Sequence, residues 1–189
     1  MNEWQYRRGA RVVQRGGLIA YPTEAVFGLG CDPSNRAAVE RLVRLKQRGP
    51  GQGFIIIAAS FSQIAGWIRF PNLEVRARVE ATWPGPVSWV VPTTPRAPSW
   101  LQGHGATMAV RITDFEPVRR LCQLAGPLVS TSANRRGQPP LRDALRVRAV
   151  FGAEVDWVVP GSCGGQAGPS ELRRAVDGQI LRAAISPAH

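Results

Sequence analysis

Short apolar runs recur along this chain, and most of them alternate with segments of helical periodicity. The clearest run covers residues 54–58 (FIIIA), after a helical segment that ends near Lys46 and a glycine-rich turn at residues 49–53. A continuous apolar run bounded by turn residues is typical of a strand that is buried on both faces. Helices that alternate with such strands predict an α/β fold. We therefore expect one α/β domain over residues 1–189, in which strands alternate with helices.

The same patterns predict the positions of the other elements. Predicted helices cover residues 2–15, 35–48, 60–67, 72–82, 115–125 and 141–151, and predicted strands cover residues 18–21, 54–59, 87–91, 107–112, 128–129 and 155–159. Ser34 or Asn35 is expected to cap the second helix, and Thr113 or Asp114 is expected to cap the fifth. The glycine-rich segment at residues 161–170 is a candidate lid.

The charge balance indicates anionic partners. The chain has 24 Lys and Arg residues against 13 Asp and Glu residues, a formal net charge of +11 and a pI of about 11.3. Such a surface attracts nucleotides, RNA or both, and the charge alone does not choose between them. The sequence has no apolar run of about 18 residues and no apolar signal core near residue 1, so we expect a cytoplasmic protein.

Histidine and cysteine are too scarce for several familiar kinds of site. His104 and His189 are the only histidines, which comes close to excluding a Ser/His/Asp triad or a histidine metal centre. Cys31, Cys122 and Cys163 match no zinc spacing and no disulfide framework. We expect no metal held by the protein and three reduced cysteines.

One lysine stands among the 24 basic residues, and it lies two positions before an arginine. Lys46 and Arg48 end the predicted second helix and precede a glycine-rich turn, a position where α/β folds place ligand loops. An ammonium is a compact point charge and a guanidinium is a planar fork, so together they suit a polyphosphate or a carboxylate. The alternative is a pair of cations that interact with the dipole at the end of the helix.

Two further positions are compatible with either a ligand contact or an ordinary structural role. Pro22 is expected to end the first strand, and Thr23 beside it either caps a helix, which the local sequence favours, or contacts a ligand. Arg111 lies within an apolar strand, where an unpaired buried charge is costly. It is therefore either at a sheet edge with its charge in water, or aimed into a cleft at a carboxylate or phosphate.

Hydroxyl and amide side chains cluster at the end of the fifth predicted strand. The sequence there reads Ser130-Thr131-Ser132-Ala133-Asn134. Strand alternation turns Ser130 and Ser132 the same way, which favours a ligand site. The alternative is a serine/threonine turn with an asparagine cap.

These motifs occur in one order, and the ordered set resembles the YrdC/TsaC family of threonylcarbamoyl-AMP synthases. The motifs are Tyr21-Pro22-Thr23-Glu24, Lys46-x-Arg48, Ala109-Val110-Arg111, the cluster at residues 130–134, Pro169-Ser170-Glu171 and Leu181-Arg182. The resemblance covers almost the whole chain. It implies a YrdC-like α/β fold, which is a twisted, open mixed sheet with flanking helices and a positively charged concave surface.

The resemblance also implies a reaction and its substrates. L-threonine, bicarbonate (or CO2) and ATP would give threonylcarbamoyl-AMP and pyrophosphate. Partner proteins would then transfer the threonylcarbamoyl group to the adenine next to the anticodon of certain tRNAs. A carbamate oxygen would attack the α-phosphorus of ATP, so the reaction needs no protein nucleophile. Mg²⁺ is expected to arrive with ATP.

Residue roles follow from the same resemblance, position by position. Threonine would be held by Thr23, Arg111, Ser130 and Ser170. ATP would be held by Lys46, Arg48, Gln52, Thr107, Ser132, Asn134 and Arg182. Lys46 and Arg48 would in addition serve catalysis.

A non-catalytic module that binds double-stranded or ribosomal RNA is the alternative that the net charge supports. Against it, the sequence has no ordered run of exposed aromatic residues and no basic repeat. A protein that contacts only the phosphate backbone of RNA also does not need Arg111 within an apolar strand or the hydroxyl cluster at residues 130–134. Weak tRNA binding beside catalysis is compatible with arginines spread over one face. Pyrophosphate release that depends on both threonine and bicarbonate distinguishes an enzyme from such a module.

Overall fold

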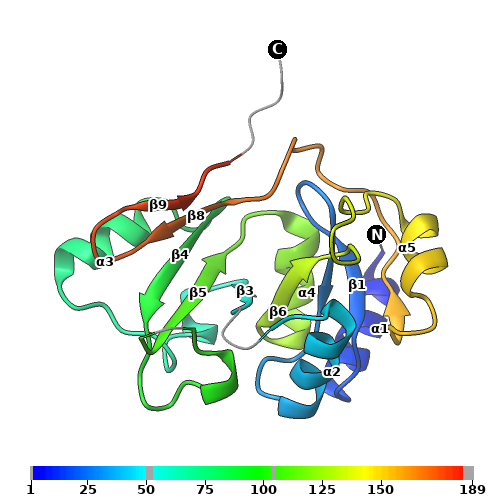
Figure 1. The fold of residues 1–189 in the computed structure, drawn as a ribbon, viewed down its shortest axis with the longest axis horizontal. Helices are drawn as coiled ribbons and strands as arrows, with labels where there is room; N and C mark the ends of the chain where they lie inside the picture. Colours follow the sequence, from blue (N-terminus) through cyan, green and yellow to red (C-terminus); the bar gives the residue numbers. More distant parts are fainter. Residues whose placement is uncertain (1, 50–52, 104, 185–189) are drawn as a thin grey trace.

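A mixed sheet of nine strands organises the part of the chain that the structure describes, residues 2–49, 53–103 and 105–184 (Figure 1). The structure is a computed structural model. The strand order is β7-β1-β2-β6-β3-β5-β4-β8-β9. The strands are β1 (Ile19–Pro22), β2 (Phe27–Gly30), β3 (Ile55–Ala58), β4 (Val87–Pro92), β5 (Thr107–Ile112), β6 (Leu128–Ser132), β7 (Trp157–Val158), β8 (Glu171–Arg174) and β9 (Ile180–Arg182). Strand β3 pairs parallel with β5 and antiparallel with β6, which confirms the predicted α/β fold with a mixed sheet.

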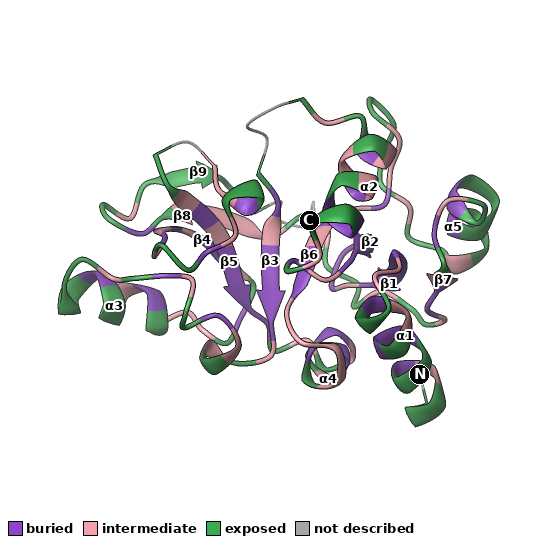
Figure 2. Cartoon of the chain, turned by 90° about the horizontal axis from the view of Figure 1, so that it is seen from below, coloured by how far each residue is buried: buried purple, intermediate pink, exposed green. Residues whose placement is uncertain are grey.

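Helices cover both faces of the sheet. They are α1 (Glu3–Gln14), α2 (Arg36–Lys46), α3 (Leu73–Glu80), α4 (Glu116–Ala125) and α5 (Ala144–Phe151). Helices α1 and α4 pack together on one face, and α2 lies on the other (Figure 2). The longest described helix, α1, has 12 residues, and none in the described ranges combines the length and apolar character that crossing a membrane requires.

The first strand contributes side chains to two hydrophobic cores. Ile19 and Tyr21 pack with α1 and α4, in a cluster that includes Leu121. Leu18 and Ala20 belong to the other cluster, which includes residues of α2. Each fully buried Leu or Ile side chain stabilises the fold by about 1.5–3 kcal/mol. Because this strand is held on both faces, the turn that follows it has a defined position.

That turn leads into a strand, β2, that the sequence patterns do not predict. Pro22 ends β1 but still pairs with Phe27 of β2, and the Thr23 amide donates to the carbonyl oxygen of Val26. Thr23 therefore lies in a hairpin turn, and the helix cap favoured for it is wrong. Half of the residues in β2 are glycines, which weaken strand propensity and hide the strand from pattern reading.

The helix caps depend on which side chain reaches the first turn. Asn35, and not Ser34, caps α2 by accepting a backbone hydrogen bond of 3.1 Å. The N-cap residue of α4 is Phe115, and no side chain caps that helix. The Thr113 or Asp114 cap is therefore wrong, and the Thr113 hydroxyl is used elsewhere.

Two predicted helices are shorter than the sequence suggests. The segment at residues 60–67 forms only a 3-10 turn at Phe61–Gln63, and the side chain of its N-cap residue, Ser60, makes no capping hydrogen bond. The last helix begins at Ala144 and not at residue 141, because the Asp143 side chain accepts from the amides of the first helical turn. A cap thus decides where the helix begins.

Gly30→Ala is expected to destabilise the fold. A Cβ at Gly30 would overlap the carbonyl oxygen of Val129 and approach Tyr21 Cε1 at 2.9 Å. Overpacking of this kind costs about 1–3 kcal/mol, so the denaturant midpoint of unfolding should fall. Gly66→Ala is the matched control, because nothing lies within 4 Å of a Cβ built there. Equal midpoints for the two variants would contradict the close approach of β2 and β6.

Candidate functional site

A cavity of about 240 Å³ opens where the β1–β2 turn, strands β3, β5 and β6, and the segment before β8 meet. Most of the residues predicted to bind substrates line it. They are Thr23, Arg48, Arg111, Ser130, Ser132, Ser170 and Arg182. The fold thus brings side chains that are far apart in the sequence to one place.

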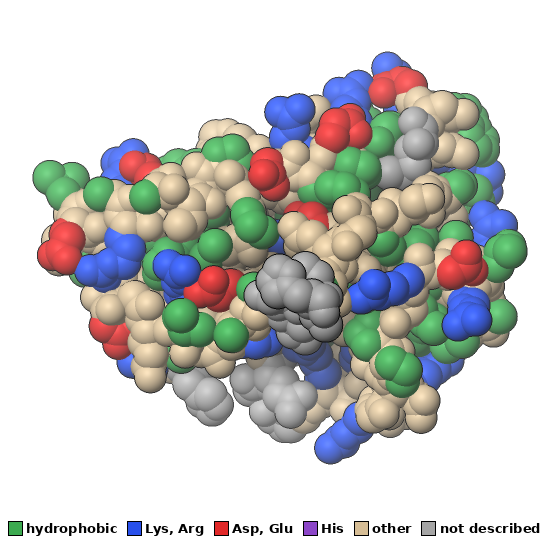
Figure 3. All heavy atoms as spheres, turned by 90° about the horizontal axis from the view of Figure 1, so that it is seen from above, with side chains coloured by type: hydrophobic (Ala, Val, Ile, Leu, Met, Phe, Trp, Pro, Cys, Tyr) green, Lys and Arg blue, Asp and Glu red, His purple; other side chains and the backbone are tan. Residues whose placement is uncertain are grey.

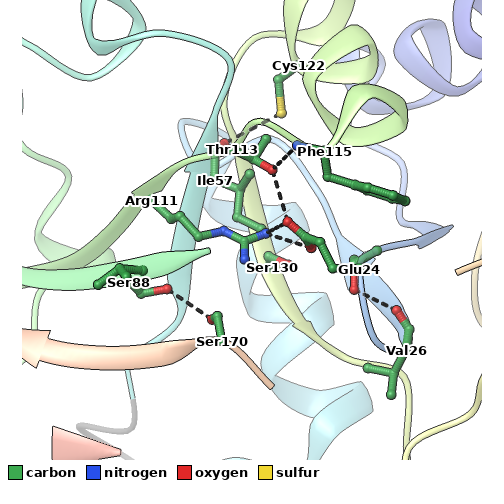
Figure 4. A network of polar contacts seen from close by, with 12 residues as sticks. Glu24, Val26, Ile57, Ser88, Arg111, Thr113, Phe115, Cys122, Ser130 and Ser170 are labelled. Carbon is green, nitrogen blue, oxygen red and sulfur yellow. Dashed lines mark hydrogen bonds and ion pairs between the residues drawn. The ribbon is translucent and has the colours of Figure 1, made fainter. Parts of the chain in front are cut away.

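Arg111 forms a buried ion pair that the sequence patterns do not predict. Strand β5 lies between β3 and β4, so the edge position considered for Arg111 is wrong. Only 4% of its side chain is exposed, and Nη2 donates to both carboxylate oxygens of Glu24, at 2.8 and 2.9 Å. Figure 4 shows the guanidinium reaching from β5 toward Glu24 in the β1–β2 turn. The charge of Arg111 is therefore balanced at the wall of the cavity.

Part of the Arg111 guanidinium keeps its hydrogen-bonding capacity. The pair with Glu24 uses Nη2 alone. The Nε atom is buried and has no partner among the described residues. An unmade hydrogen bond at a buried donor is costly, and a guanidinium is suited to carboxylates and phosphates. The wall at Arg111 therefore suits an anionic group of a ligand.

Thr113 holds the Glu24 carboxylate from a second direction. Its Oγ1 donates to Glu24 Oε1 at 3.2 Å and accepts from the amide of Phe115 at 3.2 Å (Figure 4). Glu24, Arg111 and Thr113 are all buried. The hydroxyl expected to cap α4 thus joins the ion pair to the segment that enters α4.

Hydroxyl groups line the β6 side of the cavity. Ser130 and Ser132 both face it, as strand alternation predicts, although Thr131 between them also reaches the lining. Tyr21 Oη donates to Ser130 Oγ at 2.8 Å. Burial raises the pKa of the Tyr21 phenol, so this group stays protonated and keeps donating. Ser130 Oγ is consequently oriented by a fixed donor.

Ser170 and Arg182 close the cavity from the β8–β9 side. The Oγ atoms of Ser170 and Ser88 lie 3.2 Å apart. Arg182 donates from Nη2 and Nε to the carbonyl oxygen of Ser170, at 2.8 and 3.2 Å. Partial burial and then the positive charge of Arg111 lower the pKa of Arg182. Strand β9 thereby holds the segment that carries Ser170.

Lys46 reaches from the end of α2 to the end of β6. Its ammonium donates to the carbonyl oxygens of Ser132 and Asn134, at 2.8 and 2.5 Å, and to Asn134 Oδ1 at 2.7 Å. An ammonium has three N–H donors, and these bonds use all of them. Lys46 lies in the last turn of α2, where its charge can interact with the helix dipole, but its contacts extend beyond that helix end. It ties α2 to the turn after β6.

The surroundings of Lys46 disfavour its charged form. Burial, followed by the positive charges of Arg48 and Arg135, lowers the pKa of Lys46 to about 8. The ion pairs found among the described residues give it no carboxylate to offset this effect. An anion bound nearby would stabilise the ammonium and raise the pKa again.

The turn after β6 is held by its own side chains. Ser132 Oγ donates to Asn134 Oδ1 at 2.7 Å, and Asn134 Nδ2 donates to the carbonyl oxygen of Gln138 at 2.8 Å. Asp143, and not Asn134, caps the helix that follows. The asparagine-cap alternative is wrong, and the side chains instead build a turn around the ammonium of Lys46.

Arg48 is anchored beside this turn. Nη1 donates to the carbonyl oxygen of Gly53 at 2.5 Å, and Nη2 donates to Thr131 Oγ1 at 3.0 Å. The guanidinium lies 4.4 Å from the centre of the Phe54 ring. Burial lowers the pKa of Arg48, which nevertheless stays charged, as arginine does in proteins. These contacts fix the orientation of the Arg48 guanidinium beside the cavity.

The candidate lid at residues 161–170 is bonded to the β1–β2 turn. Gly164 N–H donates to the carbonyl oxygen of Thr23 at 3.0 Å, and Gln166 N–H donates to that of Glu24 at 2.9 Å. A Cβ at Gly164 would meet Phe115 Cε2 at 2.8 Å. The end of this segment, from Gln166 onward, contributes to the cavity lining. Opening of the segment stays a prediction.

Four predicted residues do not line the cavity in the described structure. Lys46 and Asn134 are joined to it through Ser132. Thr107 lies on β5, outside the lining, and Gln52 falls outside the described residues. Their contacts with ATP stay predictions.

Glu24 and Tyr21 are the important residues that sequence reasoning does not assign to the site. Both belong to a motif quoted for the resemblance, but no local pattern predicts their partners, which lie 87 and 109 positions away. A carboxylate directly after a buried strand was the available signal for Glu24.

The described residues do not fit a protein-held Mg²⁺ ion. No group of three or more His, Cys, Asp or Glu side chains gathers among them. Glu24 is the only acidic residue among the described residues that line the cavity, and both of its oxygens contact Arg111. Cys31, Cys122 and Cys163 are free thiols, as expected.

Comparison with known sequences relates this chain to proteins named threonylcarbamoyl-AMP synthase. The Sua5/YciO/YrdC family model, described as "Telomere recombination", matches residues 11–184. A threonylcarbamoyl-AMP synthase of Nitrosococcus oceani is 49% identical over 180 residues, which cover 95% of this chain and 97% of the relative. A threonylcarbamoyl-AMP synthase of Sodalis glossinidius is 50% identical over 168 residues, which cover 87% of this chain and 88% of the relative.

Solved structures share the fold described above. The structure of P. abyssi Sua5 complexed with L-threonine matches with a TM-score of 0.88 and 29% identity, over 97% of this chain. This chain spans 55% of the length of that protein. E. coli YciO matches with a TM-score of 0.84 and 21% identity, over 98% of this chain and 91% of that one, a likeness of fold alone. With the family model and the relatives in agreement, the chain belongs to the Sua5/YciO/YrdC family.

Proposed function

We propose that this protein is a threonylcarbamoyl-AMP synthase, which converts L-threonine, bicarbonate (or CO2) and ATP into threonylcarbamoyl-AMP and pyrophosphate. The observation that carries the proposal is the cavity, where the partly paired guanidinium of Arg111 shares one space with Arg48 and Arg182. The names of the relatives, which match over nearly their whole length, support the same activity. The product would supply threonylcarbamoyladenosine formation next to the anticodon of tRNA.

The threonine subsite in this proposal surrounds Arg111. The carboxylate of threonine takes the unpaired Nε–H, which satisfies a buried donor. Hydroxyl groups of Ser130 and Ser170 face the remaining polar atoms of threonine, and the Thr23 hydroxyl, which donates to the carbonyl oxygen of Val26 at 2.7 Å, can still accept a hydrogen bond. A site whose polar groups need partners rejects amino acids that lack the matching hydroxyl.

The nucleotide subsite is proposed to extend from the turn after β6 to Arg182 on the β9 side of the cavity. Its residues are Lys46, Arg48, Ser132, Asn134 and Arg182. Two fixed guanidinium forks and a turn rich in donors suit the oxygens of a polyphosphate. The roles of Gln52 and Thr107 toward ATP stay predictions.

Catalysis in this proposal is electrostatic. The amine of threonine takes up CO2 to form a carbamate, a carbamate oxygen attacks the α-phosphorus of ATP, and pyrophosphate leaves. Negative charge builds on the phosphate oxygens, where Lys46 and Arg48 stabilise it. The cavity also holds the two anionic substrates together, which lowers the entropic part of the barrier.

Further partners enter as part of the same proposal. Mg²⁺ travels with ATP, and other proteins transfer the threonylcarbamoyl group to tRNA. Weak tRNA contact and a cytoplasmic location stay predictions from the sequence. Figure 3 shows Lys and Arg side chains spread among acidic and apolar ones on one face, without a single basic patch. Apart from the net charge of the sequence, no observation on the described residues favours the alternative of a non-catalytic RNA-binding module.

The direct assay of this proposal is pyrophosphate release from ATP by the purified protein. Release should require both L-threonine and bicarbonate, since the nucleophile is the carbamate that these two form. Omission of either compound is the control. Release that proceeds without threonine, or none with all substrates present, would contradict the proposed reaction.

Arg111→Ala is expected to raise the KM for threonine far more than the KM for ATP. The variant loses a charge-assisted hydrogen bond, which contributes about 1.5–3 kcal/mol, or roughly ten- to a hundredfold. Steady-state kinetics with each substrate varied in turn measures the two constants. A larger effect on ATP than on threonine would place Arg111 in the other subsite.

Lys46→Arg is expected to lower kcat by at least about tenfold, which corresponds to about 1.4 kcal/mol. A planar fork cannot direct its donors at the three acceptors that surround the ammonium. Lys46→Ala should be worse, because it also removes the charge. A thermal melt of each variant checks the fold. Near-normal turnover of a folded arginine variant would show that the point charge is not required.

The kcat/KM for ATP is expected to fall as the pH rises through about 8. The protonated form of Lys46 holds the turn and attracts phosphate, and that proton is lost in the free enzyme with a pKa of about 8. The kcat should hold to higher pH, because bound ATP stabilises the ammonium. The matched control is Lys46→Arg, whose charge does not titrate in this range. If the kcat/KM of Lys46→Arg for ATP fell over the same pH range, the titrating group would be a residue other than Lys46.

A further inference from the structure

We propose that Glu24 is a positioning residue for threonine, which acts through Arg111 and not by touching the substrate. This inference rests on the proposed function and deepens it, because it names the group that orients the threonine subsite. The geometry, the charge and the anchoring of Glu24 support this role.

The geometry restricts Arg111 to one orientation. Nη2 is shared between both oxygens of Glu24, and the exposed fractions of the two side chains are 4% and 9%. Charge-assisted bonds of a guanidinium carry directional specificity as well as energy. Because Glu24 occupies Nη2 only, Nε is left unpaired. Glu24 therefore determines that Nε, and not Nη2, of Arg111 is the atom left to bind a ligand.

The charge of Glu24 separates the two subsites. It is the only carboxylate among the described lining residues, which also include Arg48, Arg111 and Arg182. The pair of Glu24 and Arg111 is neutral as a unit and suits a zwitterionic amino acid. Without Glu24, Arg111 would carry an unbalanced charge that attracts polyphosphate into the threonine subsite.

The anchoring of Glu24 keeps it on Arg111. Thr113 Oγ1 donates to Glu24 Oε1 at 3.2 Å, and the carbonyl oxygen of Glu24 accepts from Gln166 N–H at 2.9 Å. The side chain and the backbone of Glu24 are therefore both held by hydrogen bonds within the protein. A carboxylate held in this way acts on threonine only through the guanidinium that it orients.

The test is a double-mutant cycle on threonine affinity, measured by calorimetry with Glu24→Ala, Arg111→Ala and the double variant. Glu24→Ala should raise the Kd for threonine by about tenfold or more. The double variant should bind no worse than Arg111→Ala alone, because two residues that act as one unit are not additive. The KM for ATP should change by less than about twofold.

Two further variants separate positioning from loss of stability. Glu24→Gln removes the charge, keeps the size and retains one acceptor oxygen, so it should fold and weaken threonine binding less than Glu24→Ala. Asp156→Asn breaks another ion pair, between Asp156 and Arg41, whose residues do not line the cavity. Its melting temperature should fall while the Kd for threonine stays at the wild-type value.

Distinct outcomes overturn the inference. Folded Glu24→Gln with unchanged threonine affinity would show that Glu24 does not position Arg111. Additive losses in the double variant would mean that Glu24 contacts threonine itself. Wild-type protein that binds no threonine and releases no pyrophosphate would overturn the proposed function, and the inference with it.

Discussion

The burial of Arg111 against Glu24 is the interaction on which the cavity depends. It joins the β1–β2 turn to β5, two segments that the sheet order separates by β2, β6 and β3. Removing both charges from water is costly. The attraction between them and their hydrogen bonds must offset this desolvation. Both oxygens of Glu24 are used, whereas Nε of Arg111 is not. An anionic ligand would complete the set of hydrogen bonds.

Lys46 organises the other end of the cavity by a different physical means. Its ammonium holds the turn after β6 through three neutral acceptors and gains no carboxylate from the described ion pairs. Burial and then the positive charges of Arg48 and Arg135 lower its pKa, and no carboxylate of those ion pairs offsets them. One end of the cavity is thus a neutral ion pair, and the other is a cluster of cations. That difference lets one cavity distinguish an amino acid from a polyphosphate.

Local patterns in the sequence predict much of the fold and less of the site. The apolar runs around Ile56 and Val110 become paired central strands, and Asn35 caps its helix as expected. Strand β2 is missed because glycine carries no strand signal, although Gly30 is required for close packing. The partner of Arg111 is missed because a contact across 87 positions leaves no local pattern. The roles of the site residues come from the order of motifs, through the family resemblance.

A crystal structure of the protein soaked with L-threonine would show directly which atoms of Arg111 the substrate contacts. The carboxylate of threonine should lie about 2.7–2.9 Å from Nε of Arg111, while Nη2 still contacts both oxygens of Glu24. Threonine bound with its amine toward Arg111, or in place of Glu24 on Nη2, would contradict the proposed roles of Arg111 and Glu24.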